Sequence, residues 1–69
     1  MEEQTYFKKL RELREDHDYT QKYVANILGL SQRGYSHYET GHYDLTATIL
    51  IKLSKLYNVS VDYILGLSD

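Results

Sequence analysis

The most informative part of this chain is TQKYVANILGLSQRGYSHYETG, residues 20–41. It contains two segments with helical patterning, separated by Leu-Gly-Leu-Ser. Thr20 and Ser31 are good N-cap residues, because their side-chain oxygens can accept a hydrogen bond from an unpaired backbone N–H. Gly29 is a natural C-cap residue, since glycine adopts the left-handed conformation at low cost. The stretch therefore predicts two short helices, over residues 21–28 and 32–40, joined by a tight turn.

Three further helices are predicted, one before this pair and two after it. Apolar residues recur at helical spacing before and after it, and no proline interrupts them. Ser or Thr precedes the later segments, and a glycine follows the last one, as helix boundaries require. These helices are expected over residues 4–17, from a cap at Asp44 or Thr46 to about residue 57, and over residues 61–65. A chain of 69 residues forms one domain at most, so we expect a single all-α domain of five helices over residues 1–69, with no strand.

Apolar patterning also predicts which side chains form the core. The fourth helix is expected to bury a broad inner face made of Ala47, Leu50, Ile51, Leu53, Ser54 and Tyr57.

The composition is that of an ordinary globular domain, with 42% hydrophobic and 26% charged residues. A chain this short has little room for a deep pocket beside its core, which weighs against a catalytic cleft. No nucleophile, base and orienting group come together at any spacing. We therefore expect no enzyme activity, no cofactor and no small-molecule substrate.

The chain has no cysteine, so neither a disulfide framework nor a thiolate metal site can form. Its three histidines, His17, His37 and His42, lack a paired metal-binding spacing, so no metal is expected. No apolar run approaches the ~18 residues that a membrane span needs, and the N-terminal segment is charged. A cytoplasmic location without membrane attachment is expected.

The net charge of −2 and the pI of about 5.8 weigh against nucleic-acid binding, because such domains are often strongly basic. The acidic residues are unevenly distributed, however, and six of the ten precede residue 20. Between residues 21 and 55 the cations are Lys22, Arg33, Lys52 and Lys55, and the acids are Glu39 and Asp44. The region around the helix pair is therefore mildly basic.

The helix at residues 32–40 carries a polar outer arc made of Gln32, Arg33, Ser36, His37 and Thr40. Long polar side chains on such an arc can reach base edges in the major groove. Short polar residues at the N-termini of the two helices, here Thr20 and Ser31, place backbone N–H groups where they can meet phosphates. The tight turn would set the angle between the helices. This combination predicts contact with double-stranded DNA.

The chain resembles the Cro/C1-type helix-turn-helix family of phage repressors, also called the xenobiotic-response-element-like family. The matching segments are LRELRE at 10–15, TQ at 20–21, VA at 24–25, LGLS at 28–31, YETG at 38–41 and IKLSKLYNVSVDYILG at 51–66. The resemblance implies a lambda-repressor-like fold whose helix-turn-helix covers residues 20–40. It also implies a repressor-like transcriptional regulator that binds a two-fold operator as a homodimer.

The resemblance assigns roles to individual residues. Gln21 would bind a phosphate and brace Gln32, and Arg14 and Glu39 would form a structural ion pair between the first and third helices. The groove-facing residues would be Ser31, Gln32, Arg33, Ser36 and His37, and Thr40 and His42 would hold the DNA backbone beyond the helix.

The chain departs from the family pattern at several positions. Ile27, Ile49 and Leu67 are apolar where the family is commonly polar or variable, so they are expected on the surface, as scattered apolar residues or as part of a dimer patch. His37 and His42 stand where basic residues are common, Leu45 where proline is common, and Gly34 and Tyr35 where Thr or Ser and Ile are usual. These changes lower the positive charge of the DNA face. The alternative hypothesis is a protein-interaction module of the same fold, such as an antitoxin or a phage control protein, whose acidic first helix meets a basic partner.

Overall fold

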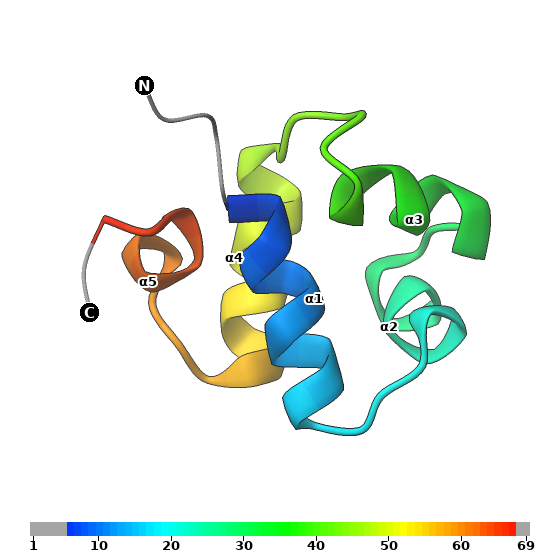
Figure 1. Cartoon of the computed structure of the whole chain (residues 1–69), viewed down its shortest axis with the longest axis horizontal. Helices are drawn as coiled ribbons and strands as arrows, with labels where there is room; N and C mark the ends of the chain where they lie inside the picture. The colour runs from blue at the N-terminus through cyan, green and yellow to red at the C-terminus, as the bar shows by residue number, and fades with distance from the viewer. Residues whose placement is uncertain (1–5, 68–69) are drawn as a thin grey trace.

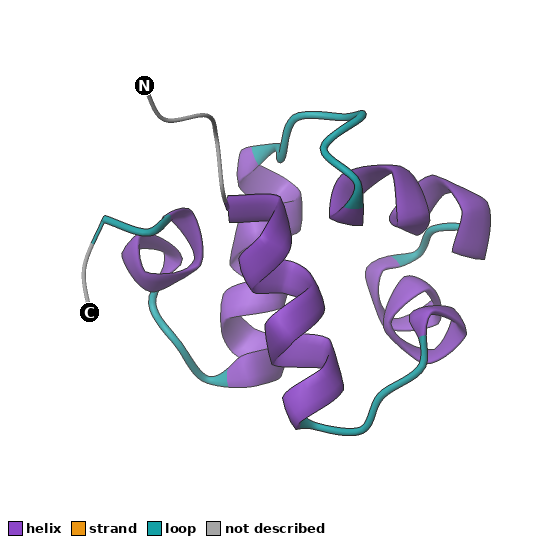
Figure 2. Cartoon of the chain, viewed as in Figure 1, coloured by secondary structure: helices purple, strands orange, loops and turns teal. Residues whose placement is uncertain are grey.

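The computed structural model describes residues 6–67, and all regular structure within them is α-helical (Figure 2). The helices are α1 (Tyr6–Asp16), α2 (Gln21–Leu28), α3 (Gln32–Glu39), α4 (Ala47–Tyr57) and α5 (Val61–Leu65). The expected all-α, five-helix architecture is confirmed. In Figure 1, α1 crosses the centre of the molecule in front of α4, with α5 on one side and the α2–α3 pair on the other. Within residues 6–67, no helix combines the length and the apolar character that a membrane crossing would need.

The helix boundaries differ from the expected ones by only a few residues. The α2 segment matches the prediction, whereas α3 ends at Glu39 and Thr40 is its C-cap. The first helix was expected over residues 4–17. It ends at Asp16, and residues 4 and 5 lie outside the described part of the chain.

The helices α2 to α5 begin in the same way. In each, a Ser or Thr hydroxyl accepts a hydrogen bond from the backbone N–H three residues later, at 3.0 to 3.2 Å. These caps are Thr20, Ser31, Thr46 and Ser60. A hydroxyl cap of this kind contributes about 1 kcal/mol, because it satisfies a donor that the helix itself leaves unpaired.

All five helices also end in the same way. A residue with positive φ follows the last turn, and the next backbone N–H bonds to the carbonyl five residues earlier, as in α2, where Leu30 N donates to Ala25 O at 2.8 Å. At Gly41 (φ 81) a Cβ would also lie 3.1 Å from the ring of Phe7, so glycine suits this position for two reasons. The residues with positive φ are Asp18, Gly29, Gly41, Asn58 and Gly66.

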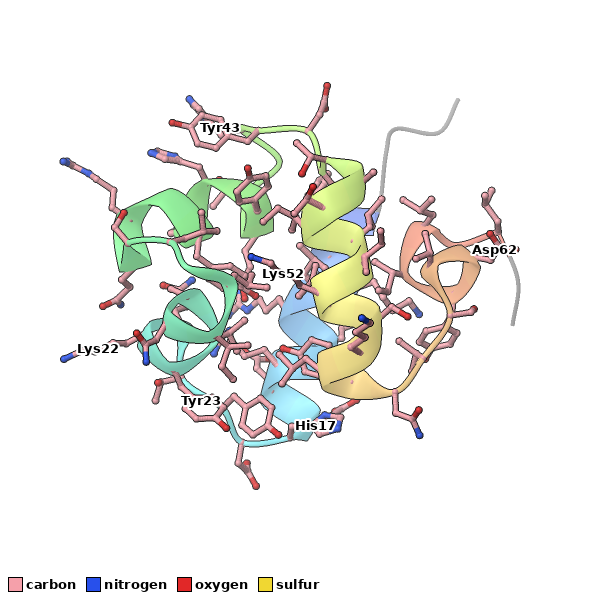
Figure 3. The ribbon with its side chains drawn as sticks, turned by 180° about the vertical axis from the view of Figure 1, so that it is seen from behind. His17, Lys22, Tyr23, Tyr43, Lys52 and Asp62 are labelled. Atoms are coloured by element: carbon pink, nitrogen blue, oxygen red, sulfur yellow. The ribbon has the colours of Figure 1, made fainter. Side chains whose placement is uncertain are left out.

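A single core connects the helices. Tyr35, on α3, is its largest fully buried side chain. The core consists of Leu10, Leu13, Val24, Ala25, Leu28, Tyr35, Ile49, Leu53, Tyr57 and Ile64. A hydrogen bond adds to this packing, since Lys52 reaches from α4 toward α2 and its Nζ donates to the Leu28 carbonyl at 3.4 Å (Figure 3). That carbonyl is at the C-terminal end of α2, where a cation is favourable.

The expected burial along α4 was wrong at three positions, one of which is Ala47, which is exposed although it was expected on the inner face. Ile49 is buried, although it was expected on the surface, and Ile51 is 51% exposed, although it was expected in the core. The seam that faces the core is Ile49, Leu53 and Tyr57, which follow each other one turn apart. Ile51 lies two residues from Ile49, and two residues turn a helix by about 200°. It therefore points away from the core.

Candidate nucleic-acid interface

The N-terminus of α2 and the outer arc of α3 form one side of an open surface hollow. Gln21, Gln32, Arg33, Ser36 and His37 line it. These are five of the nine residues expected to contact DNA, and they come from two helices that pack directly on each other. Gln32 and Arg33 are exposed, whereas Ser36 and His37 are half-buried. The hollow thus presents amide, guanidinium, hydroxyl and imidazole groups together.

Thr20 and Ser31, the expected N-cap residues of the helix pair, directly precede α2 and α3. The Thr20 hydroxyl accepts from Tyr23 N and the Ser31 hydroxyl from Gly34 N, each at 3.0 Å. A hydroxyl that accepts a backbone hydrogen bond still has its own proton to donate. Thr20 lines a second hollow beside the first, which shares Gln32 with it and includes Lys22. Figure 3 shows Lys22 projecting outward from α2.

An ion pair lies beneath the α3 surface and joins α3 to α1. Arg14 Nε lies 2.6 Å from Glu39 Oε2, and Arg14 Nη2 donates to Glu39 Oε1 at 3.2 Å. The side chains are only 14% and 4% exposed, so solvent screens the pair weakly. Arg14 Nη1 also donates to the Tyr19 carbonyl at 3.0 Å. This is the contact between the first and third helices that the family resemblance implied.

The same carboxylate accepts hydrogen bonds from two further side chains, and neither bond was predicted from the sequence. Tyr35 Oη donates to Glu39 Oε2 at 2.6 Å, and Gln21 Nε2 donates to Oε1 at 3.1 Å. Tyr35 and Glu39 are four residues apart on α3, a spacing that places side chains on one helix face, so this part of the network had a sequence signal. The Gln21 contact had none, because it joins α2 to α3.

The hydrogen bonds to Glu39 control its ionisation. Burial alone would raise the pKa of Glu39, but hydrogen bonds from Arg14, Tyr35 and Gln21 outweigh burial and hold that pKa below its usual range. The hydrogen bond from Arg14 to Glu39 raises the pKa of Arg14, against the opposing effect of burial. Burial, followed by the nearby Glu39 carboxylate, raises the pKa of Tyr35. At neutral pH the network therefore holds one carboxylate, one guanidinium and one neutral phenol.

The expected contacts beyond α3 have local partners of their own. Thr40 Oγ1 donates to the His37 carbonyl at 3.2 Å, so its proton is used within the helix end. His42 is exposed, and its ring centroid lies 5.0 Å from that of His37. The structure therefore brings His42 close to His37, which is one of the five residues that line the hollow.

No cluster of three or more His, Cys, Asp or Glu side chains that could hold a metal ion occurs within residues 6–67. The third histidine, His17, lies at the end of α1, where its ring contacts those of Tyr19 and Tyr57. On the surface formed by α2 and α3, the groups available to a ligand are therefore hydrogen-bonding side chains and a few charged side chains.

Comparison with known proteins places this chain in a family. A helix-turn-helix family model matches residues 10–64. The chain belongs to this family. The Cro/C1-type resemblance seen in the sequence is thereby confirmed, and the matched range includes both helices of the helix-turn-helix as well as α4.

Two relatives of this helix-turn-helix domain are regulators from Bacillus subtilis (strain 168). The chain is 46% identical over 59 residues to the HTH-type transcriptional regulator ImmR, covering 86% of the chain and 46% of ImmR. It is 41% identical over 64 residues to the uncharacterized HTH-type transcriptional regulator YobD, covering 93% of the chain and 57% of YobD. The chain thus spans about half the length of these relatives.

The fold is also that of a solved repressor. The crystal structure of the P22 c2 repressor protein in complex with a synthetic operator matches with a TM-score of 0.84. The match covers 96% of this chain and 100% of the repressor chain at 24% sequence identity. At that identity the likeness concerns the fold, which agrees with the lambda-repressor-like architecture expected from the sequence.

Proposed function

We propose that this helix-turn-helix domain binds double-stranded DNA sequence-specifically and acts as a repressor-like transcriptional regulator, with α3 in the major groove. The observation that carries the proposal is the α3 surface itself. Its polar outer arc lines a surface hollow beside the N-terminus of α2, and the Arg14–Glu39 ion pair beneath it holds α3 to α1. The names of ImmR and YobD and the operator-bound form of the P22 c2 repressor support the same function.

The chemistry of the side chains suggests how the proposed site divides its work. Arg33 has the paired donors that guanine O6 and N7 require, and Gln32 has the donor and acceptor that match adenine. Ser36 lies beside them in the hollow and would complete the base-facing group, whereas His37, in the last turn of α3, would meet the DNA backbone at the edge of the groove. We assign sequence reading to the base-facing group.

The remaining residues would hold the DNA backbone. Thr20 and Ser31 would donate their hydroxyl protons to phosphates while they cap their helices. Gln21 has one amide N–H bonded to Glu39, which leaves its second N–H for a phosphate. His42 would contact the strand beyond the end of α3, and Thr40 would do so once its hydroxyl proton turns from the His37 carbonyl to a phosphate.

We further propose that the domain acts as a homodimer on a two-fold operator, with all 69 residues forming one domain. In such a complex the two α3 helices lie about 34 Å apart, one turn of DNA. A second subunit doubles the phosphate contacts, which matters for a chain whose net charge is −2. Because the target is DNA, we propose a cytoplasmic location.

A salt titration of binding to random and selected duplexes tests the proposal. DNA binding should weaken with salt along a log–log slope of about −0.9 per phosphate contact. A selection from a random duplex pool, with the stoichiometry measured, would give the preferred site and the number of subunits on it. Failure to bind any duplex at low salt would refute the proposal and favour a protein-interaction module.

The substitution Arg33→Ala tests the reading role of α3. It should cost about 1–3 kcal/mol of binding free energy and relax specificity at one base position. Lys55→Ala is the matched charge control, since Lys55 is an exposed cation in the last turn of α4. Equal losses on all duplexes would mean that Arg33 contacts only phosphate.

A further inference from the structure

Three aromatic rings gather where α3 ends and its following loop begins. The ring centroid of His37 lies 5.0 Å from that of His42 and 4.8 Å from that of Tyr43. The His37 carbonyl accepts hydrogen bonds from the backbone N–H groups of His42 at 2.9 Å and of Tyr43 at 3.2 Å. The loop is therefore folded back onto the last turn of α3. We call His37, His42 and Tyr43 the imidazole cluster.

The imidazole cluster continues the proposed DNA-binding surface. His37 lines the same hollow as Arg33 and Gln32. His42 is exposed, and Tyr43 is 46% exposed although it packs against His37 and Tyr38. Figure 3 shows Tyr43 at the loop between α3 and α4. The polar face thus extends past the helix without a break.

This part of the surface has few permanent positive charges. Arg33 is the one Lys or Arg within α3. Arg33 lies one turn before His37 on α3, Asp44 follows Tyr43 in the loop, and Arg14 and Glu39 pair with each other between α1 and α3. The two imidazoles are therefore the groups that can add charge where the surface lacks it.

A histidine side chain changes charge close to neutral pH, at about pH 6.5 when its environment is neutral. The C-terminal end of a helix favours a cation, and His37 lies in the last turn of α3. Arg33, one turn earlier, opposes a second positive charge. Phosphates of a bound duplex would offset that repulsion.

We propose that His37 and His42 bind phosphates of the DNA backbone as imidazolium ions, with Tyr43 holding both rings in place, so that DNA affinity rises as the pH falls through neutrality. This inference rests on the proposed DNA-binding function. A phosphate stabilises the protonated ring, so complex formation takes up protons, and by linkage acid strengthens binding. Affinity stops rising once the rings are protonated in the unbound protein as well.

The test measures fluorescence anisotropy of a labelled mixed-sequence duplex at about pH 5.5 and at about pH 8. A mixed-sequence duplex suffices, because phosphate contacts are independent of sequence. The wild type should bind at least about tenfold more tightly at the lower pH, which corresponds to about 1.4 kcal/mol of binding free energy. Its log–log salt slope should also become more negative by about 0.9 for each imidazolium that contacts a phosphate.

Three variants identify the groups responsible. The double variant His37→Gln/His42→Gln should bind equally at both pH values, and His37→Arg/His42→Arg should bind tightly at both. His17→Gln is the matched control, because His17 is exposed at the end of α1 and packs against Tyr19 and Tyr57. It should retain the full pH dependence. Circular dichroism at both pH values checks that each variant is folded.

Equal wild-type affinity at both pH values would overturn the inference while leaving the proposed function intact. A pH dependence that persists in His37→Gln/His42→Gln, or that disappears in His17→Gln, would also overturn it. So would a folded His37→Arg/His42→Arg protein that fails to bind. Absence of duplex binding at both pH values would instead refute the proposed function itself.

Discussion

Glu39→Gln is expected to remove the central acceptor of the network beneath α3. The carboxylate accepts four hydrogen bonds, two at Oε2 and two at Oε1, from Arg14, Tyr35 and Gln21. A glutamine amide is neutral, and its NH₂ group cannot accept any of these bonds. The substitution therefore leaves the guanidinium of Arg14, whose side chain is 14% exposed, without a counter-charge.

The expected loss can be estimated from this geometry. Removing one partner of a buried ion pair costs about 3–5 kcal/mol of unfolding free energy. Because Arg14 keeps some access to solvent, the lower end applies, about 3 kcal/mol. For a domain of this size, each kcal/mol lowers the melting temperature by about 4–8 °C, so a fall of about 12–24 °C is expected. That is a large part of the total stability of a small domain.

Urea and thermal unfolding, followed by circular dichroism at neutral pH, measure this loss. Glu15→Gln is the matched control, since Arg11 and Glu15 form an ion pair at 3.0 Å with side chains 67% and 53% exposed. An exposed pair four residues apart on a helix contributes about 0.3–0.5 kcal/mol, so this control should change stability little. The contrast isolates the effect of burial on the same pair of residue types.

The pH dependence of the free energy of unfolding gives a second check on the role of Glu39. The pKa of Glu39 is lower in the folded protein than in the unfolded chain, so its contribution is fully present above the ordinary glutamate pKa. The contribution is lost as the pH falls below that value and through the folded-state pKa. The wild type should therefore approach Glu39→Gln in stability at acidic pH. A Glu39→Gln protein no less stable than Glu15→Gln, or a difference that stays constant into acid, would refute this account of the network.

Two further predictions concern stability, and urea unfolding measures both. Tyr57 has a buried hydroxyl with no hydrogen-bond partner among the described residues, and burial raises the pKa of Tyr57 to about 12. Tyr57→Phe should be neutral or stabilising by up to about 1 kcal/mol, and a loss above about 1 kcal/mol would argue against an unpaired hydroxyl. Gly29→Ala should cost about 1–2 kcal/mol, because φ is 75° there, whereas Asp18→Gly should stabilise by up to about that amount, because Asp18 has φ 58°. Changes of the same sign at Gly29 and Asp18 would contradict the strain argument.

Local structure was predictable because its causes lie within a few residues. The ends of α2 and of its turn are set at Thr20, Gly29 and Ser31, through hydrogen bonds between residues three to five positions apart. Such signals can be read from sequence without knowing where any other helix lies. The positive φ of Asp18 was missed, since aspartate adopts that conformation much less often than glycine.

The network around Glu39 was only partly predictable. The family resemblance implied its pairing with Arg14, and the spacing on α3 could have indicated Tyr35. Its bond to Gln21 depends on the angle and distance between α2 and α3, which no local pattern specifies. The wrong predictions for Ile49 and Ile51 have a different cause. Because α4 is apolar on most sides, hydropathy alone does not distinguish its buried face from its exposed faces.

The shared ending of the five helices has a consequence for how fast the chain folds. Each stop signal lies within the residues that adjoin its helix, so no helix depends on a distant contact to define its length. Proteins whose contacts are mostly local fold rapidly, because little chain entropy is lost before stabilising contacts form. The slow step is then expected to be the docking of preformed helices, above all of α1, which packs against both α3 and α5. The Arg14–Glu39 pair can form only during that docking, so the α3 surface reaches its final geometry late in folding.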